Sequence, residues 1–207
     1  MNSIFSMIGF KIMQEEKYIK IKKFFQVALE NHQKNNFKTA EELYMKVLKI
    51  EPNHLNSIFL LGSLFIQTQN FNSAKQLLEK ALEINPNYAD AHNNLGIAMQ
   101  GLNNFPKALS CYEKAIEIKP IFPQAYHNLG LIFYKLGKIE KAKNCYEKAL
   151  KISPDYADAH NNLGIVFKEL GNFKEAINCY EKATQYKPGP RKQFAGENAK
   201  KDSLRKK

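Results

Sequence analysis

Apolar and small residues recur along most of the chain with the spacing of an α-helix. One stripe occupies positions i, i+3, i+4 and i+7, which share a helix face: His92, Leu95, Gly96 and Met99. A second stripe follows it: Ala108, Tyr112 and Ala115. Between the stripes lie Asn103 and Asn104, and asparagine or glycine supplies the left-handed residue that closes a helix. The pattern predicts two helices joined by a tight turn.

This pair of stripes is repeated along the chain. A proline recurs every 34 residues: Pro52, Pro86, Pro120, Pro154 and Pro188. The pentapeptide CYEKA begins at Cys111, Cys145 and Cys179, and the octamer ADAHNNLG occurs unchanged from Ala89 and from Ala157. Proline cannot continue a helix, so it ends each pair. A fixed period of this size indicates a stack of helical hairpins.

Four glycines lie inside the predicted first helices, where each costs about 1 kcal/mol relative to alanine: Gly62, Gly96, Gly130 and Gly164. We expect a close approach of the paired helix to offset that cost. The small residues expected opposite them are Ala74, Ala108, Ala142 and Ala176. The tyrosines expected to fill the space between neighbouring units are Tyr112, Tyr146 and Tyr180.

Together, the Leu-Gly pairs and the later alanine, tyrosine and proline at this period resemble the tetratricopeptide repeat. The resemblance implies an all-α solenoid, a right-handed superhelix of helix–turn–helix hairpins. It places five units at 21–54, 55–88, 89–122, 123–156 and 157–190. Residues 1–20 are expected to be an N-terminal extension, partly helical or disordered, and 191–207 a basic, disordered tail.

Such a stack curves, and its first helices line a concave face. Beside the core stripe of units three to five stand nine candidate peptide-binding residues: Asn93, Asn94, Ile97, His127, Asn128, Leu131, Asn161, Asn162 and Ile165. A carboxamide has two donors and an acceptor, so a row of asparagines can bond the main chain of an extended peptide. The row is similar to the asparagine ladder in the repeat arm of O-linked N-acetylglucosamine transferases. The alternative is that these asparagines cap local backbone or face solvent.

Other site chemistry is disfavoured. The clamp with which some of these repeats bind chaperone tails needs lysine and arginine. The matching positions hold Asp90, Asn94, Gln124, Asn128, Asp158 and Asn162. The sequence lacks a phosphate-binding loop and a nucleophile elbow, and its cysteines form no CxxC pair. We therefore predict no catalytic residues, cofactor or metal, and three separate structural thiols at Cys111, Cys145 and Cys179.

Composition and charge disfavour further classes of function. The 31 Lys and Arg against 20 Asp and Glu give a net charge of +11, nearly half of it in the tail. Seven basic residues with little aromatic interleaving make specific nucleic-acid binding an unfavoured hypothesis. No apolar run reaches the roughly 20 residues of a membrane span, and the first thirteen residues do not fit a signal peptide. Three cysteines suit a reducing compartment, so the predicted localisation is cytoplasmic.

The tail has too few apolar residues to form a capping helix. The open end of the fifth unit would then be covered by the tail, by self-association, or by a domain outside this sequence. The leading prediction is a non-catalytic scaffold that binds an extended peptide of an unidentified protein partner. The alternative is the repeat arm, or a fragment, of a glycosyltransferase-like enzyme without its catalytic domain.

Overall fold

The structure is a computed structural model that describes the backbone of residues 2–186 and the side chains of residues 11 and 13–186. This part of the chain is entirely helical and contains no strand. Its helices, in order, are α1 (Asn2–Gln33), α2 (Phe37–Ile50), α3 (Leu55–Gln67), α4 (Phe71–Ile84), α5 (Ala89–Gly101), α6 (Phe105–Ile118), α7 (Pro123–Lys135), α8 (Ile139–Ile152), α9 (Ala157–Glu169) and α10 (Phe173–Tyr186). The predicted all-α class is confirmed.

Each odd-numbered helix pairs with the even-numbered helix that follows it. In every pair one residue in the left-handed region, with φ between 58° and 77°, closes the first helix: Asn35, Gln69, Asn103, Gly137 and Gly171. The left-handed turn predicted from asparagine and glycine is confirmed, and Gln69 shows that the geometry persists where glutamine occupies the left-handed position. Pro106 lies in the first turn of α6, where its missing N–H costs nothing.

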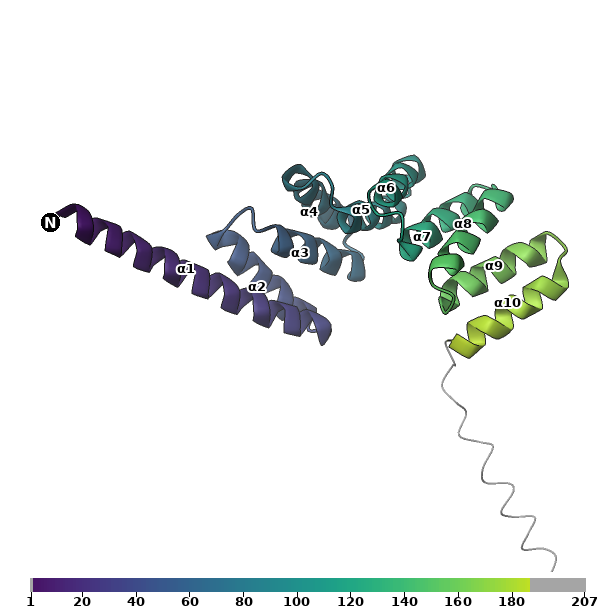
Figure 1. The fold of residues 1–207 in the computed structure, drawn as a ribbon, viewed down its shortest axis with the longest axis horizontal. Helices are drawn as coiled ribbons and strands as arrows, with labels where there is room; N and C mark the ends of the chain where they lie inside the picture. Colours follow the sequence, from purple (N-terminus) through teal and green to yellow (C-terminus); the bar gives the residue numbers. More distant parts are fainter. Residues whose placement is uncertain (1, 187–207) are drawn as a thin grey trace, which may run out of the picture.

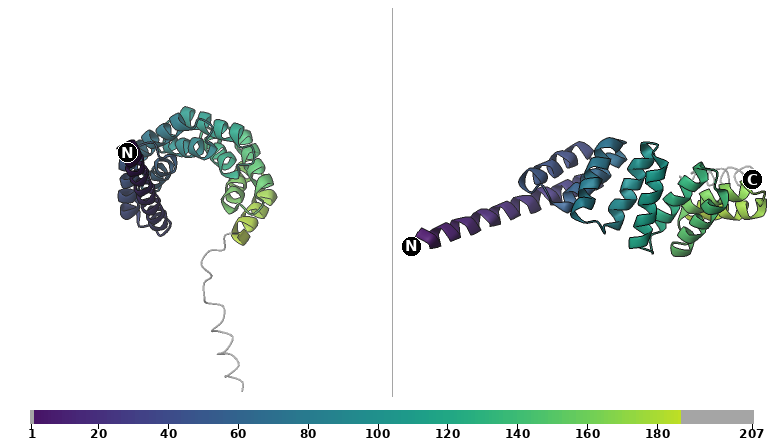
Figure 2. Two further views of the ribbon diagram at one scale, coloured as in Figure 1. Left: turned by 60° about the vertical axis from the view of Figure 1, so that its left-hand side comes forward. Right: turned by 90° about the horizontal axis from the view of Figure 1, so that it is seen from above.

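The hairpins stack in sequence order and form a curved array (Figures 1 and 2). Each even-numbered helix contacts the first helix of the next unit, and α5 also contacts α3 and α7 directly, as α9 contacts α7. The odd-numbered helices therefore form the inner layer of the arc, and the even-numbered helices form the outer layer. The predicted solenoid of helical hairpins is confirmed.

The close approach expected at the helical glycines is present; the facing residue is Leu78 at Gly62 and a tyrosine at the other three. A Cβ added to Gly130 would lie 2.6 Å from a ring carbon of Tyr146 on the paired helix. Gly96 and Gly164 have the same relation to Tyr112 and Tyr180. The nearest side chain at these three glycines is therefore the tyrosine and not the expected alanine, because the flat ring occupies the space that the missing side chain leaves. The tyrosines also reach the next unit, since Tyr146 packs in one cluster with Leu163 and Val166 of α9.

The N-terminal helix is longer than the first repeat requires. The predicted boundary at residue 20 does not appear in the backbone, because α1 runs from Asn2 to Gln33 without a break. No proline precedes Pro52, so nothing in this segment stops a helix. The first half of α1 projects beyond the stack (Figure 1), and its side chains Met13, Tyr18 and Ile19 are exposed.

The remaining boundaries coincide with helix starts. Leu55, Ala89, Pro123 and Ala157 begin α3, α5, α7 and α9, and they are also the first residues of predicted units two to five. The division into five units stays a prediction. The predicted tail at 191–207 lies outside the described residues. Within residues 2–186, every helix is too short or too polar to cross a bilayer.

Candidate peptide-binding face

Three asparagines from successive inner helices form the centre of the candidate site. Asn94, Asn128 and Asn162 stand at the same position of α5, α7 and α9, and each is half-buried. Each Nδ2 group donates a hydrogen bond to the preceding unit: Asn94 to Ser63 Oγ at 2.9 Å, Asn128 to Asn93 Oδ1 at 3.0 Å, and Asn162 to His127 Nε2 at 2.8 Å. The row therefore links adjacent repeats and orients its own amides.

Asn93 and His127 accept two of these bonds and are themselves buried. Their exposed fractions are 6% and 8%, because the following inner helix lies over them. Asn93 also donates from Nδ2 to Oδ1 of Asn94 at 3.3 Å, which makes a continuous polar chain from Ser63 to Asn128. The structure differs here from the expectation that both side chains are open to a partner. Their contribution to this face is to hold the asparagines Asn128 and Asn162 in place.

His127 is the most constrained polar group of the site. Its ring lies 5.0 Å from that of Tyr156 and 5.8 Å from that of Tyr146, between centroids. Because Nε2 accepts from Asn162, the ring proton lies on Nδ1, which is 3.3 Å from the hydroxyl of Tyr156. Burial lowers the pKa of His127 below its usual range. The imidazole is therefore neutral at pH 7, and its Nε2 can accept the hydrogen bond from Asn162.

The other candidates are more accessible. Asn161, on α9, is exposed, and the aliphatic residues beside the row are half-buried: Ile97, Leu131 and Ile165. The sequence did not single out Ser63, although it stands one period before Ile97 and its hydroxyl is the first acceptor of the chain. The signal that could have identified Ser63 is a small polar residue at a position where units three to five have isoleucine or leucine.

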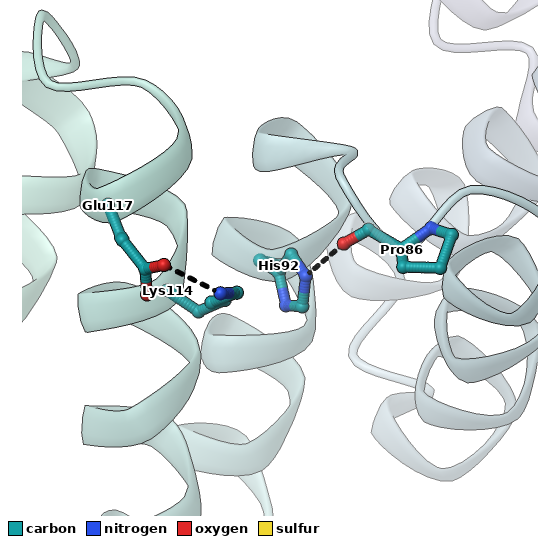
Figure 3. A network of polar contacts seen from close by, with 4 residues as sticks. All are labelled: Pro86, His92, Lys114 and Glu117. Carbon is teal, nitrogen blue, oxygen red and sulfur yellow. Dashed lines mark hydrogen bonds and ion pairs between the residues drawn. The ribbon is translucent and has the colours of Figure 1, made fainter.

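Two further histidines fix the helices rather than the concave face. His92 on α5 is half-buried, and its Nε2 lies 2.9 Å from the carbonyl oxygen of Pro86 in the preceding loop (Figure 3). His160 on α9 makes the same contact with Pro154 at 2.8 Å. The core stripe predicted from the sequence contains His92, which is only half-buried, whereas His160 one octamer copy later is buried. Each N–H donates to a carbonyl of the preceding loop and so ties that loop to the helix.

The cysteines form a separate row on the outer layer. Cys111, Cys145 and Cys179 are buried free thiols. Burial raises the pKa of Cys111 and Cys145 to about 11, so neither is a thiolate at pH 7. In the part of the chain that the structure describes, no cluster of three or more histidine, cysteine or acidic residues could hold a metal ion. The amides and aliphatic side chains of the inner layer, in contrast, are suited to hydrogen bonding and apolar packing.

Known proteins place this architecture in a family. A model of the TPR repeat matches residues 62–103, 101–137 and 130–171, and two models of the tetratricopeptide repeat match residues 24–54 and 157–190. None of the curated proteins matches the sequence.

Solved structures are similar along most of the chain. The MamA protein is 26% identical with a TM-score of 0.67, over 81% of this chain and 92% of that chain. Two others show the fold alone. One is pilF of Pseudomonas aeruginosa, with 20% identity and a TM-score of 0.76 over 84% of this chain and 79% of that one. The other is YrrB, described as a TPR protein with an unusual peptide-binding site, with 22% identity and a TM-score of 0.61 over 86% and 90%. The first family model alone spans more than half of the sequence, so this chain belongs to the tetratricopeptide repeat family.

Proposed function

We propose that this chain is a non-catalytic interaction scaffold that holds an extended segment of a partner protein on the inner layer of α5, α7 and α9. The observation that carries this function is the row of oriented amides. Asn94, Asn128 and Asn162 are each fixed by a hydrogen bond to the preceding unit. A carboxamide has two N–H groups, so each keeps hydrogen-bonding capacity for a ligand.

Fixed amides favour binding because little conformational entropy is lost when the peptide arrives. The row repeats once per hairpin along the inner layer, which suits an extended chain whose own N–H and C=O groups also repeat. Ile97, Leu131 and Ile165 lie beside the amides and offer apolar contact for alternate side chains. Recognition of this kind depends mainly on the peptide main chain and has modest sequence preference.

The test begins with a peptide selected from a random display library against the full chain. Asn161→Ala removes an exposed amide that is not part of the hydrogen-bonded row, so we expect about 5-fold to 10-fold weaker binding and unchanged thermal stability. Asn128→Ala should weaken binding and also lower stability, since it removes the bond to Asn93. The matched control is Asn144→Ala on the exposed surface of α8, which should change neither.

A chemical variant of the peptide separates main-chain from side-chain recognition. N-methylation of alternate peptide bonds should abolish binding, whereas alanine scanning of the peptide should have small effects at most positions. The proposed site is wrong if no peptide is selected, or if the selected peptide binds the Asn128→Ala and Asn161→Ala proteins as tightly as the Asn144→Ala protein.

A further inference from the structure

The outer helix of the fifth unit exposes positions that the other units bury or half-bury. Tyr146 of α8 is 1% exposed and packs against Leu163 and Val166 of α9. Tyr180 occupies the same position of α10 and is only half-buried. Phe173 and Ile177 on the same helix are 63% and 58% exposed. Within the described residues no further hairpin follows α10, so an apolar stripe stays uncovered.

We define the α10 face by six residues: Phe173, Lys174, Ile177, Tyr180, Glu181 and Thr184. One shallow depression is lined by Ile177, Tyr180, Glu181, Thr184 and Gln185. A second beside it is lined by Lys174, Glu175, Ile177, Asn178 and Glu181. The centre is therefore aromatic and aliphatic, and charges flank it. This is the composition of a protein interface, with an apolar core and a polar rim.

The tail is a poor cover for this face. The positions of α9 that cover the outer helix α8 are Ala159, Leu163 and Val166, and all three are buried. One period later the sequence has Gln193, Glu197 and Lys200. These side chains cannot replace the apolar contacts that Tyr146 receives, because burying them beside Tyr180 would remove their hydration without a partner.

The N-terminal end of a second copy is also poorly suited to cover the α10 face. Four periods before the same three positions, α1 has Lys23, Val27 and Glu30. Lys23 and Glu30 are charged and exposed, and Val27 is the one apolar member. A second copy that continued the stack head to tail would bury both charges against α10.

A second copy of α10 itself fits better. Lys174 and Glu181 lie seven residues apart, two turns of helix, one on each side of Ile177. When two such helices pack antiparallel about a two-fold axis near Ile177, Lys174 of each copy faces Glu181 of the other. The apolar residues at the centre of one copy then contact the same residues of the other copy, and the charges at the rim pair with opposite charges. Self-complementarity of this kind is what a two-fold interface requires.

We propose that the α10 face is a dimer interface at which a second copy of this chain packs its own α10 antiparallel across a two-fold axis. The assembly joins two arrays at their C-terminal units. Asn161 borders the α10 face, since it shares a depression with Tyr180 and Thr184. The amides of Asn94, Asn128 and Asn162 do not belong to that face, so a dimer carries two amide rows and binds a partner with two copies of the segment more tightly than one array does.

The first experiment measures the mass of the full chain in solution by light scattering across a concentration series. The wild type should approach the dimer mass as concentration rises. Ile177→Glu should weaken association by about 100-fold or more, since it puts a charge at the centre of the interface. The matched control is Ile121→Glu in the loop before α7, where the isoleucine is 74% exposed. It should leave the dimer unchanged, and circular dichroism should show equal helicity in all three proteins.

Charge reversal tests the orientation. Lys174→Glu should weaken the dimer by about 10-fold, because the two-fold axis turns two attractive pairs into two repulsive ones. Glu181→Lys should do the same, and the double variant Lys174→Glu, Glu181→Lys should restore wild-type association. In an Ile177→Cys variant, mild oxidation should link two copies through residue 177. Lack of that link, or no rescue in the double variant, overturns the antiparallel arrangement.

Two outcomes overturn the dimer altogether. One is a wild-type chain that stays monomeric at every concentration. The other is an equal loss of association in the Ile177→Glu and Ile121→Glu proteins. Deletion of residues 187–207 completes the test. A wild-type monomer that dimerises only after this deletion would show that the tail covers the α10 face within one chain.

Discussion

The helices α8 and α10 share the pentapeptide CYEKA, yet the two copies have different surroundings. Cys145 and Cys179 are equally buried, with 8% of each side chain exposed. Tyr146 and Ala149 are fully buried, whereas Tyr180 and Ala183 are half-exposed. The difference arises because α9 covers α8 and no described helix covers α10. Burial in the outer layer thus depends on the next repeat rather than on the local sequence.

The octamer ADAHNNLG shows the same effect in the inner layer. Asn93 of the first copy is buried, because α7 follows it and Asn128 donates to its side-chain oxygen. Asn161 of the second copy has the same neighbours in sequence and is exposed. An identical residue is therefore a structural link in the middle of the array and an open contact at its end.

The largest expected effect compares the two tyrosines. Tyr146→Ala should lower the free energy of unfolding by about 4 kcal/mol, since it leaves a cavity between two repeats. Tyr180→Ala should cost about half as much, because its ring is already partly in water. Urea denaturation measures both, in an Ile177→Glu background so that dimerisation does not cover Tyr180. Equal losses would show that the next repeat contributes nothing to the burial of Tyr146.

The glycines facing these rings should show a smaller contrast. Gly130→Leu should lower stability by about 2 to 3 kcal/mol, because its side chain would overlap a ring held between two repeats. Gly164→Leu meets Tyr180, whose ring can turn toward solvent, and should cost less. The same denaturation experiment applies. A larger loss at Gly164 would contradict the view that the fifth unit is more loosely packed.

The two octamer asparagines are the next pair. Asn93→Ala should lower stability by about 1 to 2 kcal/mol, since it removes two hydrogen bonds and leaves the Nδ2 of Asn128 without its acceptor. Asn161→Ala should change stability by no more than about 0.5 kcal/mol. Thermal unfolding of both variants measures the difference. If both variants unfold alike, the polar chain does not hold the repeats together.

The smallest contrast concerns the thiols. Burial raises the pKa of Cys145 to about 11, and it raises the pKa of Cys179 as well. In the unfolded chain these thiols lose their protons at lower pH, so their contribution favours the folded state below pH 9 and is lost as pH rises toward 11. Alkylation followed by mass spectrometry should show Cys179 modified several-fold faster than Cys145 at pH 9. Faster labelling of Cys145 would contradict this order.

Much of the fold follows from periodicity. The 34-residue period placed the starts of α3, α5, α7 and α9, and asparagine or glycine at the turns predicted the left-handed residues at Asn103, Gly137 and Gly171. These features depend on residues close together in the sequence. The length of α1 was not predicted, because the repeat pattern fades before Ile21, and only the lack of a helix-breaking residue indicates that the helix continues.

The candidate site was predictable as a row of positions but not as a set of contacts. A period places Asn94, Asn128 and Asn162 in line. It does not say that each amide bonds to the preceding unit, because that depends on the spacing and rotation between hairpins. For the same reason the burial of His127 was missed. Two side chains 35 residues apart, His127 and Asn162, fix each other's orientation.

Contacts between helices in the described chain join sequential neighbours, apart from those between successive inner helices. No helix from one end closes back onto the other. Opening therefore begins at a terminus and moves inward one hairpin at a time, as expected for a one-dimensional array. Amide protons of α5 to α7 should exchange with deuterium slowest, those of α10 faster until a second copy docks against it, and those of the projecting start of α1 fastest.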